Sequence, residues 1–213
     1  MGAMSNMSVY GLMIIPLAAM VKGHSISLRS HIKLSCVMTV VQLAQSTIAT
    51  AVPPDMVVAQ LCVQGVLLPL ITVAFCFFVL TDAKAAKVMR LQDCGDGDPG
   101  AVVATMWCLC YTVLFRWFPW YHSMTSRGFE AANLAAGAEA YLTLVTMLSM
   151  CRSFTTGHVA AAAAAWALHV LGAIAGATSG MPVAGTAVTA ALMTAASAMA
   201  FRAPADRRRN KLE

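Results

Sequence analysis

Charged residues are scarce in this chain: Asp, Glu, Lys and Arg together make up 11% of its 213 residues. A soluble domain carries about 25% of them, so the composition excludes an ordinary water-soluble fold. Hydrophobic residues make up 59% of the chain, and they lie in continuous runs of roughly twenty, the length of a helix that crosses a bilayer. The strands of an outer-membrane barrel alternate polar and apolar residues instead. The sequence therefore predicts an all-α, polytopic integral membrane bundle.

Motifs of the familiar enzymes are absent as well. The chain contains no GxSxG, HExxH, P-loop or dinucleotide fingerprint, and no apolar run holds a lysine that retinal would need. Seven cysteines at irregular spacing indicate neither a disulfide framework nor a zinc site. Asp93, Asp96 and Asp98 are not followed by the glutamate of a calcium loop. The sequence thus predicts no metal site, identifies no cofactor and favours a protein that is not an enzyme.

The apolar runs predict six or seven transmembrane helices in a single domain, residues 1–213. The candidate spans are 34–52, 56–80, 101–118, 130–150, 157–180 and 181–201, with 9–21 as an uncertain seventh. The run 9–21 is short and has Pro16 near its centre, and proline interrupts helical hydrogen bonding. Within the run 56–80, Gly65 and Pro69 predict a kink. Residues 202–213 are expected to form a basic tail.

Basic residues indicate how the spans are oriented. If six runs span, one side of the membrane receives twelve of the fourteen Lys and Arg residues, and the other receives only Arg116 and Arg127. By the positive-inside rule, the loops 22–33 and 81–100 and the C-terminus are expected to be cytoplasmic, in a membrane that the sequence does not identify. Because the basic residues lie in short clusters between spans, they report topology, and no nucleic-acid partner is predicted. His24 and His31, in the first of these loops, are interpreted as solvated side chains.

One acid and one histidine lie near the middle of predicted spans. Glu139 and His169 are each near the middle of an apolar run and on a face of small residues, and the two runs are consecutive. If these helices are antiparallel neighbours, the two side chains lie at equal depth. One interpretation is a buried pair that relays protons or holds a cation, because ionisable groups inside a membrane are candidates for function. The other is a structural role, since burial favours the neutral form of both groups.

Small residues repeat on the helix that carries His169. Gly172, Gly176 and Gly180 recur every four residues, and small side chains at that spacing allow two membrane helices to approach closely. The sequence predicts helix packing at these glycines, either within the chain or between protomers.

Four glutamines lie within the predicted spans 34–52 and 56–80, at positions 42, 45, 60 and 64. Gln42, Gln45, Gln60 and Gln64 are possible lining residues of an aqueous path. Each is equally suited to hydrogen bonding between helices, worth about 0.6 to 2 kcal/mol, and this structural interpretation is the favoured one.

These observations lead to two hypotheses from different classes. The first is a small transporter or channel in which Glu139 and His169 handle a proton or cation. The second is a non-catalytic subunit of a membrane protein complex, which would use the glycine face to dock partner helices. The expected partners are the lipid bilayer together with a second copy of the chain or other membrane helices.

Overall fold

The computed structural model describes residues 11–53, 55–91, 98–117 and 131–209, which form helices and no strand. Six stretches are long and apolar enough to cross a membrane. They are α3 (Ile32–Ala51), α4 (Val57–Cys62) continued by η1 (Val63–Leu67) and α5 (Leu68–Thr81), α7 (Pro99–Tyr111) continued by η3 (Thr112–Arg116), α9 (Ala131–Phe154), α10 (Val159–Ser179) and α11 (Pro182–Arg209). The predicted all-α membrane bundle is therefore confirmed, with six spans in the described part of the chain.

The first apolar run forms a short helix, Gly11–Gly23, whose main part is α2 (Ile15–Gly23) with Pro16 in its first turn. A helix of this length extends about 20 Å, which is about two thirds of the hydrocarbon core of a bilayer. Among the described residues, α2 is therefore too short to act as a seventh span. It packs against α7 instead.

Local chemistry sets several helix ends. The Asp98 carboxylate accepts the Gly100 N–H at 2.9 Å and so acts as the N-cap of α7. Pro99 occupies the first turn of this helix, where its missing backbone N–H leaves no hydrogen bond unmade. Asp82 caps the short helix α6 (Ala83–Val88) in the same way, accepting the Ala85 N–H at 2.7 Å. Gly180 ends α10 with a φ of 67°, a left-handed conformation that glycine adopts without strain.

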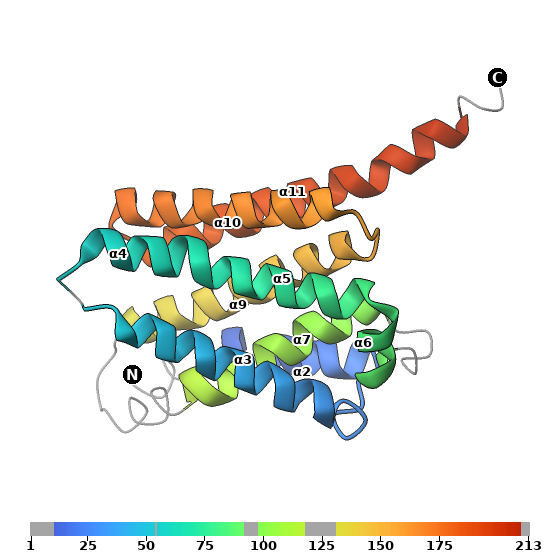
Figure 1. Ribbon diagram of the computed structural model, residues 1–213, viewed down its shortest axis with the longest axis horizontal. Coiled ribbons are helices and arrows are strands. Elements are labelled where there is room, and N and C mark those ends of the chain that lie inside the picture. Colours follow the sequence, from blue (N-terminus) through green and yellow to red (C-terminus); the bar gives the residue numbers. More distant parts are fainter. Residues whose placement is uncertain (1–10, 54, 92–97, 118–130, 210–213) are drawn as a thin grey trace.

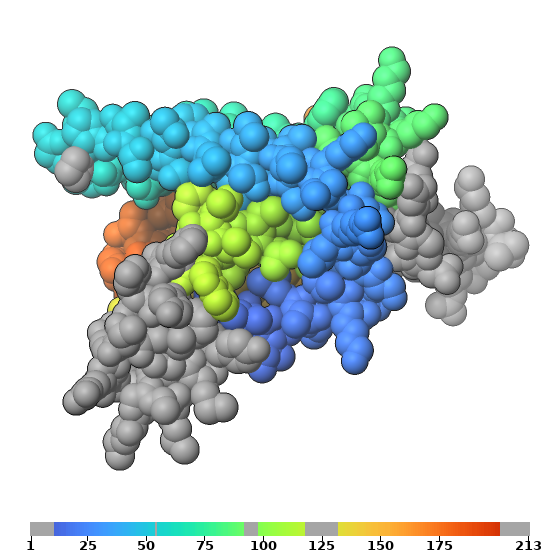
Figure 2. All heavy atoms as spheres, turned by 90° about the horizontal axis from the view of Figure 1, so that it is seen from below, coloured from blue at the N-terminus to red at the C-terminus, as the bar shows by residue number. Residues whose placement is uncertain are grey.

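The centre of the bundle is α7, which belongs to the most buried of the six candidate spans. It packs against α9, α3 and α2, and Figure 2 shows it framed by α3 and α2. On the far side of α9, the helices α10 and α11 form an antiparallel hairpin (Figure 1). α11 packs against both α9 and α10, whereas α9 and α10 contact each other little. Although α9 and α10 are consecutive spans, each therefore packs mainly against α11 or another helix and not against the other.

The long span α4–η1–α5 changes helical geometry where the sequence has Gly65 and Pro69. Residues 63–67 form a π-helical turn, and two carbonyls beside it accept side-chain donors from other helices. The Trp166 indole donates to the Val66 carbonyl at 3.0 Å, and the Gln45 amide donates to the Leu68 carbonyl at 2.9 Å. Side chains of α10 and α3 thus form hydrogen bonds with the backbone at this irregular part of the span.

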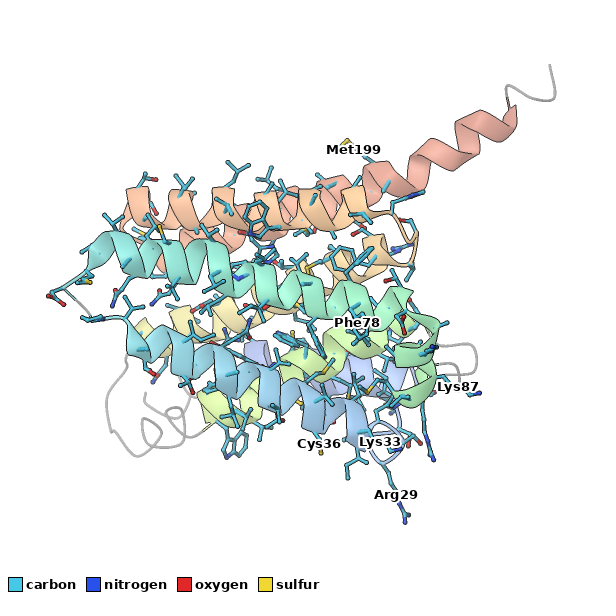
Figure 3. The ribbon with its side chains drawn as sticks, in the orientation of Figure 1. Arg29, Lys33, Cys36, Phe78, Lys87 and Met199 are labelled. Atoms are coloured by element: carbon cyan, nitrogen blue, oxygen red, sulfur yellow. The ribbon has the colours of Figure 1, made fainter. Side chains whose placement is uncertain are left out.

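The two ends of the bundle differ in charge. One end holds the α2–α3 link, α6 and the α9–α10 link, and Arg29, Lys33 and Lys87 extend from it (Figure 3). This basic end also carries Lys22, Lys84, Arg90 and Arg152. The opposite end holds the α3–α4 link and the α10–α11 turn (Figure 1). Residues 202–209 continue α11 as helix beyond the bundle, where the sequence predicted a tail.

Candidate functional site

A cavity of about 600 Å³ lies among the α4–η1–α5 span, α9, α10 and α11. It extends from Val57, Gly180 and Pro182 at the opposite end of the bundle to Met147 and His169 near mid-depth. Eight polar side chains line it: Gln60, Gln64, Glu139, Thr143, Thr146, His169, Thr186 and Thr189. Polar groups gathered inside an otherwise apolar membrane bundle are costly and therefore mark a candidate site. We refer to this space as the Glu139 cavity.

Glu139 lies in the first half of α9, and its carboxylate pairs with Arg116. The Arg116 Nη2 is 3.8 Å from the Glu139 Oε1, with exposed side-chain fractions of 14% and 40%. That distance exceeds the range of an N–H···O hydrogen bond, so this is a loose ion pair. The carboxylate keeps capacity to accept further donors or a cation from the cavity.

Arg116 reaches Glu139 from the π-helical turn η3. Its guanidinium carbon is 5.0 Å from the centre of the Tyr111 ring, a cation–π contact that holds the side chain at the edge of α7. From the sequence, Arg116 was placed only in the count of basic residues, on the less basic side of the membrane. A π-turn changes the angular position of every residue after it, so helical spacing did not indicate this partner.

His169 lies at the inner end of the Glu139 cavity. Its Nδ1 is 2.8 Å from the carbonyl oxygen of Ala165, one turn earlier in α10. Because a carbonyl only accepts, Nδ1 is the donor, and the Nε2 of the neutral ring is then the acceptor. In this tautomer, Nε2 is the ring nitrogen able to take up a proton.

Glu139 and His169 line the same cavity without forming the expected direct pair in the described structure. Glu139 is about 22 Å from the basic end of α9 and His169 about 15 Å from the basic end of α10, at 1.5 Å per residue. The prediction of equal depth was based on a run ending at residue 150, but α9 continues to Phe154. The cavity, and not a hydrogen bond, is what connects the two side chains.

The predicted glycine face divides into two parts. Gly172 and Gly176 lie against Gly185 of α11, where a Cβ on Gly185 would be 2.5 Å from the Gly172 carbonyl oxygen and 3.0 Å from the Gly176 Cα. A Cβ on Gly172 would overlap the Thr189 hydroxyl. Gly180 has open space beside it and instead forms the C-terminal turn of α10. The close helix contact is therefore internal to the chain, between α10 and α11.

The four predicted glutamines also occupy two different environments. Gln60 and Gln64 line the Glu139 cavity. Gln42 is buried and donates to the Trp107 carbonyl at 2.9 Å, while Gln45 donates to the Leu68 carbonyl and to the Thr72 hydroxyl, both at 2.9 Å. Gln42 and Gln45 therefore connect helices, and only the second pair of glutamines borders the cavity.

The fold and the cavity define a multi-pass α-helical membrane protein. Comparison with protein-family models, curated proteins and solved structures finds no match to this chain. Within the described ranges, no three His, Cys, Asp or Glu residues lie close enough together to hold a metal ion.

Proposed function

We propose that the protein is a small transporter that moves a proton or monovalent cation through the Glu139 cavity. The observation that carries this proposal is the convergence of Glu139, His169 and hydroxyl and amide groups from four spans on one cavity inside the bundle. Carboxylate, hydroxyl and amide oxygens are ligands for hard cations. A carboxylate and an imidazole also exchange protons readily near neutral pH.

The geometry of Glu139 supports cation exchange. Its loose ion pair with Arg116 offsets the negative charge of the carboxylate, which lowers the cost of that charge within the membrane. A cation or proton that enters competes with the guanidinium for the same oxygens. The Glu139 carboxylate would thus serve both the ion pair with Arg116 and the cation-binding site.

Transport requires a change of shape, because the cavity does not continue along α9. Towards the basic end, Met147, Met150 and Phe154 are each exposed by 3% or less. Gly65 and Pro69, which flank the end of the π-turn, lie on the cavity wall. Irregular turns within helices accompany functional sites and permit local bending, so we place the moving element at this turn.

Flux measurement tests the proposal. We would reconstitute the full chain in liposomes and follow proton and K⁺ or Na⁺ flux for the wild type, Glu139→Gln and the control Asp55→Asn, whose acid is exposed in the α3–α4 link. We expect flux in the wild type and in the control, and a loss of about tenfold or more in Glu139→Gln. A correctly assembled wild type without flux, or a Glu139→Gln variant with full flux, would refute the proposal.

The alternative, a docking subunit that uses the glycine face, has less support from the geometry. Gly172 and Gly176 are already in contact with Gly185 of the same chain. The feature from which that alternative was inferred is therefore occupied, and the transporter remains the proposed function.

A further inference from the structure

A second cavity, of about 700 Å³, lies at the basic end between α2, α7, α9 and α11. It shares no lining residue with the Glu139 cavity. Its polar wall consists of His24, Asp98, Ser149, Arg152, Thr194 and Ser197. Its apolar wall includes Met20 and Leu148. We call it the Arg152 cavity.

The polar wall has the donors that a phosphate group requires. Arg152 contributes a guanidinium, which binds phosphate oxygens in a forked geometry. Ser149 and Thr194 have hydroxyl oxygens 3.2 Å apart on facing helices, and Ser197 is 7% exposed. His24 adds a ring N–H at the end of α2. These groups come from three helices and converge on one space.

The acidic member of the wall has a separate role. One carboxylate oxygen of Asp98 accepts the Gly100 N–H as the N-cap of α7, so it takes part in starting that helix. The surroundings favour an anion, because Lys22, Arg29, Lys33 and Lys87 lie at the same end and are all exposed. A cluster of basic side chains near the membrane surface attracts anionic lipid and so raises its local concentration.

The position of the cavity points to a lipid rather than to a soluble anion. Arg152 lies in the last turn of α9, the level at which a basic residue meets the headgroup region. One side of the cavity is closed by α2, which is too short to span, and Met20 and Leu148 supply an apolar surface for the glycerol and the first acyl carbons. We propose that the Arg152 cavity binds the phosphate of an anionic phospholipid headgroup.

Binding to the full chain in detergent tests the inference. We would measure binding of phosphatidylglycerol, phosphatidylcholine and inorganic phosphate to the wild type, Arg152→Gln and Arg29→Gln by native mass spectrometry and thermal shift. Arg29→Gln is the matched control, because it removes one exposed arginine at the same end outside the cavity. We expect Arg152→Gln to weaken phosphatidylglycerol binding by about tenfold, the effect of losing one charged hydrogen bond. The control loses only long-range, screened attraction and is expected to weaken binding far less.

A second variant keeps the test valid if Arg152→Gln does not assemble. Ser197→Ala removes a hydroxyl from the same wall, and we expect it to weaken phosphatidylglycerol binding about threefold with an unchanged elution profile. Equal losses in Arg152→Gln and Arg29→Gln would show only surface attraction and overturn the site. Tight binding of inorganic phosphate without phosphatidylglycerol would overturn the lipid assignment, and absence of binding by both would overturn the inference altogether.

Discussion

The indole Nε1 of Trp166 donates a hydrogen bond to the carbonyl oxygen of Val66 at 3.0 Å, across 100 residues of sequence. This bond joins α10 to the π-turn of the α4–η1–α5 span. Beside it, a Cβ on Gly65 would lie only 2.9 Å from the Cβ of Ala173. The absence of a side chain at Gly65 lets α10 approach the turn closely enough for Trp166 to make its bond.

Removing this donor is expected to destabilise the π-turn. Trp166→Phe keeps an aromatic ring but leaves the Val66 carbonyl without the indole donor, and hydrogen bonds between membrane helices contribute about 0.6 to 2 kcal/mol. We expect a lower thermal transition in detergent and faster amide exchange at residues 63–67. Tyr141→Phe, at an exposed position, is the control that leaves both unchanged. Unaltered exchange in Trp166→Phe would contradict this role.

The α10–α11 contact predicts a strong effect of one methyl group. Gly185→Ala places a Cβ against the backbone of Gly172 and Gly176, and overpacking of this kind costs about 1 to 3 kcal/mol. We expect a fall of several degrees in the thermal transition. Gly23→Ala, where a Cβ meets nothing within 4 Å, is expected to be neutral. If both variants melt alike, α10 and α11 do not approach as closely as described.

Arg116 is expected to tune the affinity of the Glu139 cavity. Arg116→Gln removes the cation that competes for the Glu139 carboxylate, so the cation concentration at half-maximal flux should fall severalfold while the maximal rate changes less. Concentration series in proteoliposomes measure both quantities. Arg90→Gln, which removes a cation from the basic end, should shift neither. A higher half-saturating concentration in Arg116→Gln would contradict competition.

The charge difference between the two ends predicts sidedness. Lys87 and Asp55 are exposed at opposite ends of the bundle. The exposed Cys36 and Cys62, and Cys94, which lies outside the described residues, are first replaced by serine. A membrane-impermeant maleimide should then reach Lys87→Cys only from the cytoplasmic side and Asp55→Cys only from the other. Reversed labelling would show that the positive-inside rule fails for this chain. Labelling of both from one side would contradict the described arrangement of the ends.

Composition and run length were sufficient for the fold class, because crossing a bilayer imposes a long apolar helix. The ends of the helices were harder to predict from the sequence. The predicted span 130–150 was expected to end at residue 150, yet α9 continues to Phe154. A long basic side chain such as that of Arg152 can remain in a helix and extend to the membrane surface.

The candidate residues could be selected from sequence because polar groups are rare inside apolar runs. Their grouping could not, since it depends on which helices pack together. α11 packs against both α9 and α10. The helices that carry Glu139 and His169 are therefore consecutive in the chain without being close packing partners. Arg116 required the π-turn η3 to reach Glu139, and a single sequence contains no signal for that turn.

The short turn between α10 and α11 has a consequence for how the chain is made. Only Gly180 and Met181 separate the two helices, and Gly185 fits against α10 without an intervening side chain. Two spans joined this tightly are suited to leave the translocation machinery together as a preformed hairpin. A chain truncated before Pro182 would lack α11 and would expose to lipid the glycine backbone of α10 that Gly185 covers in the full chain.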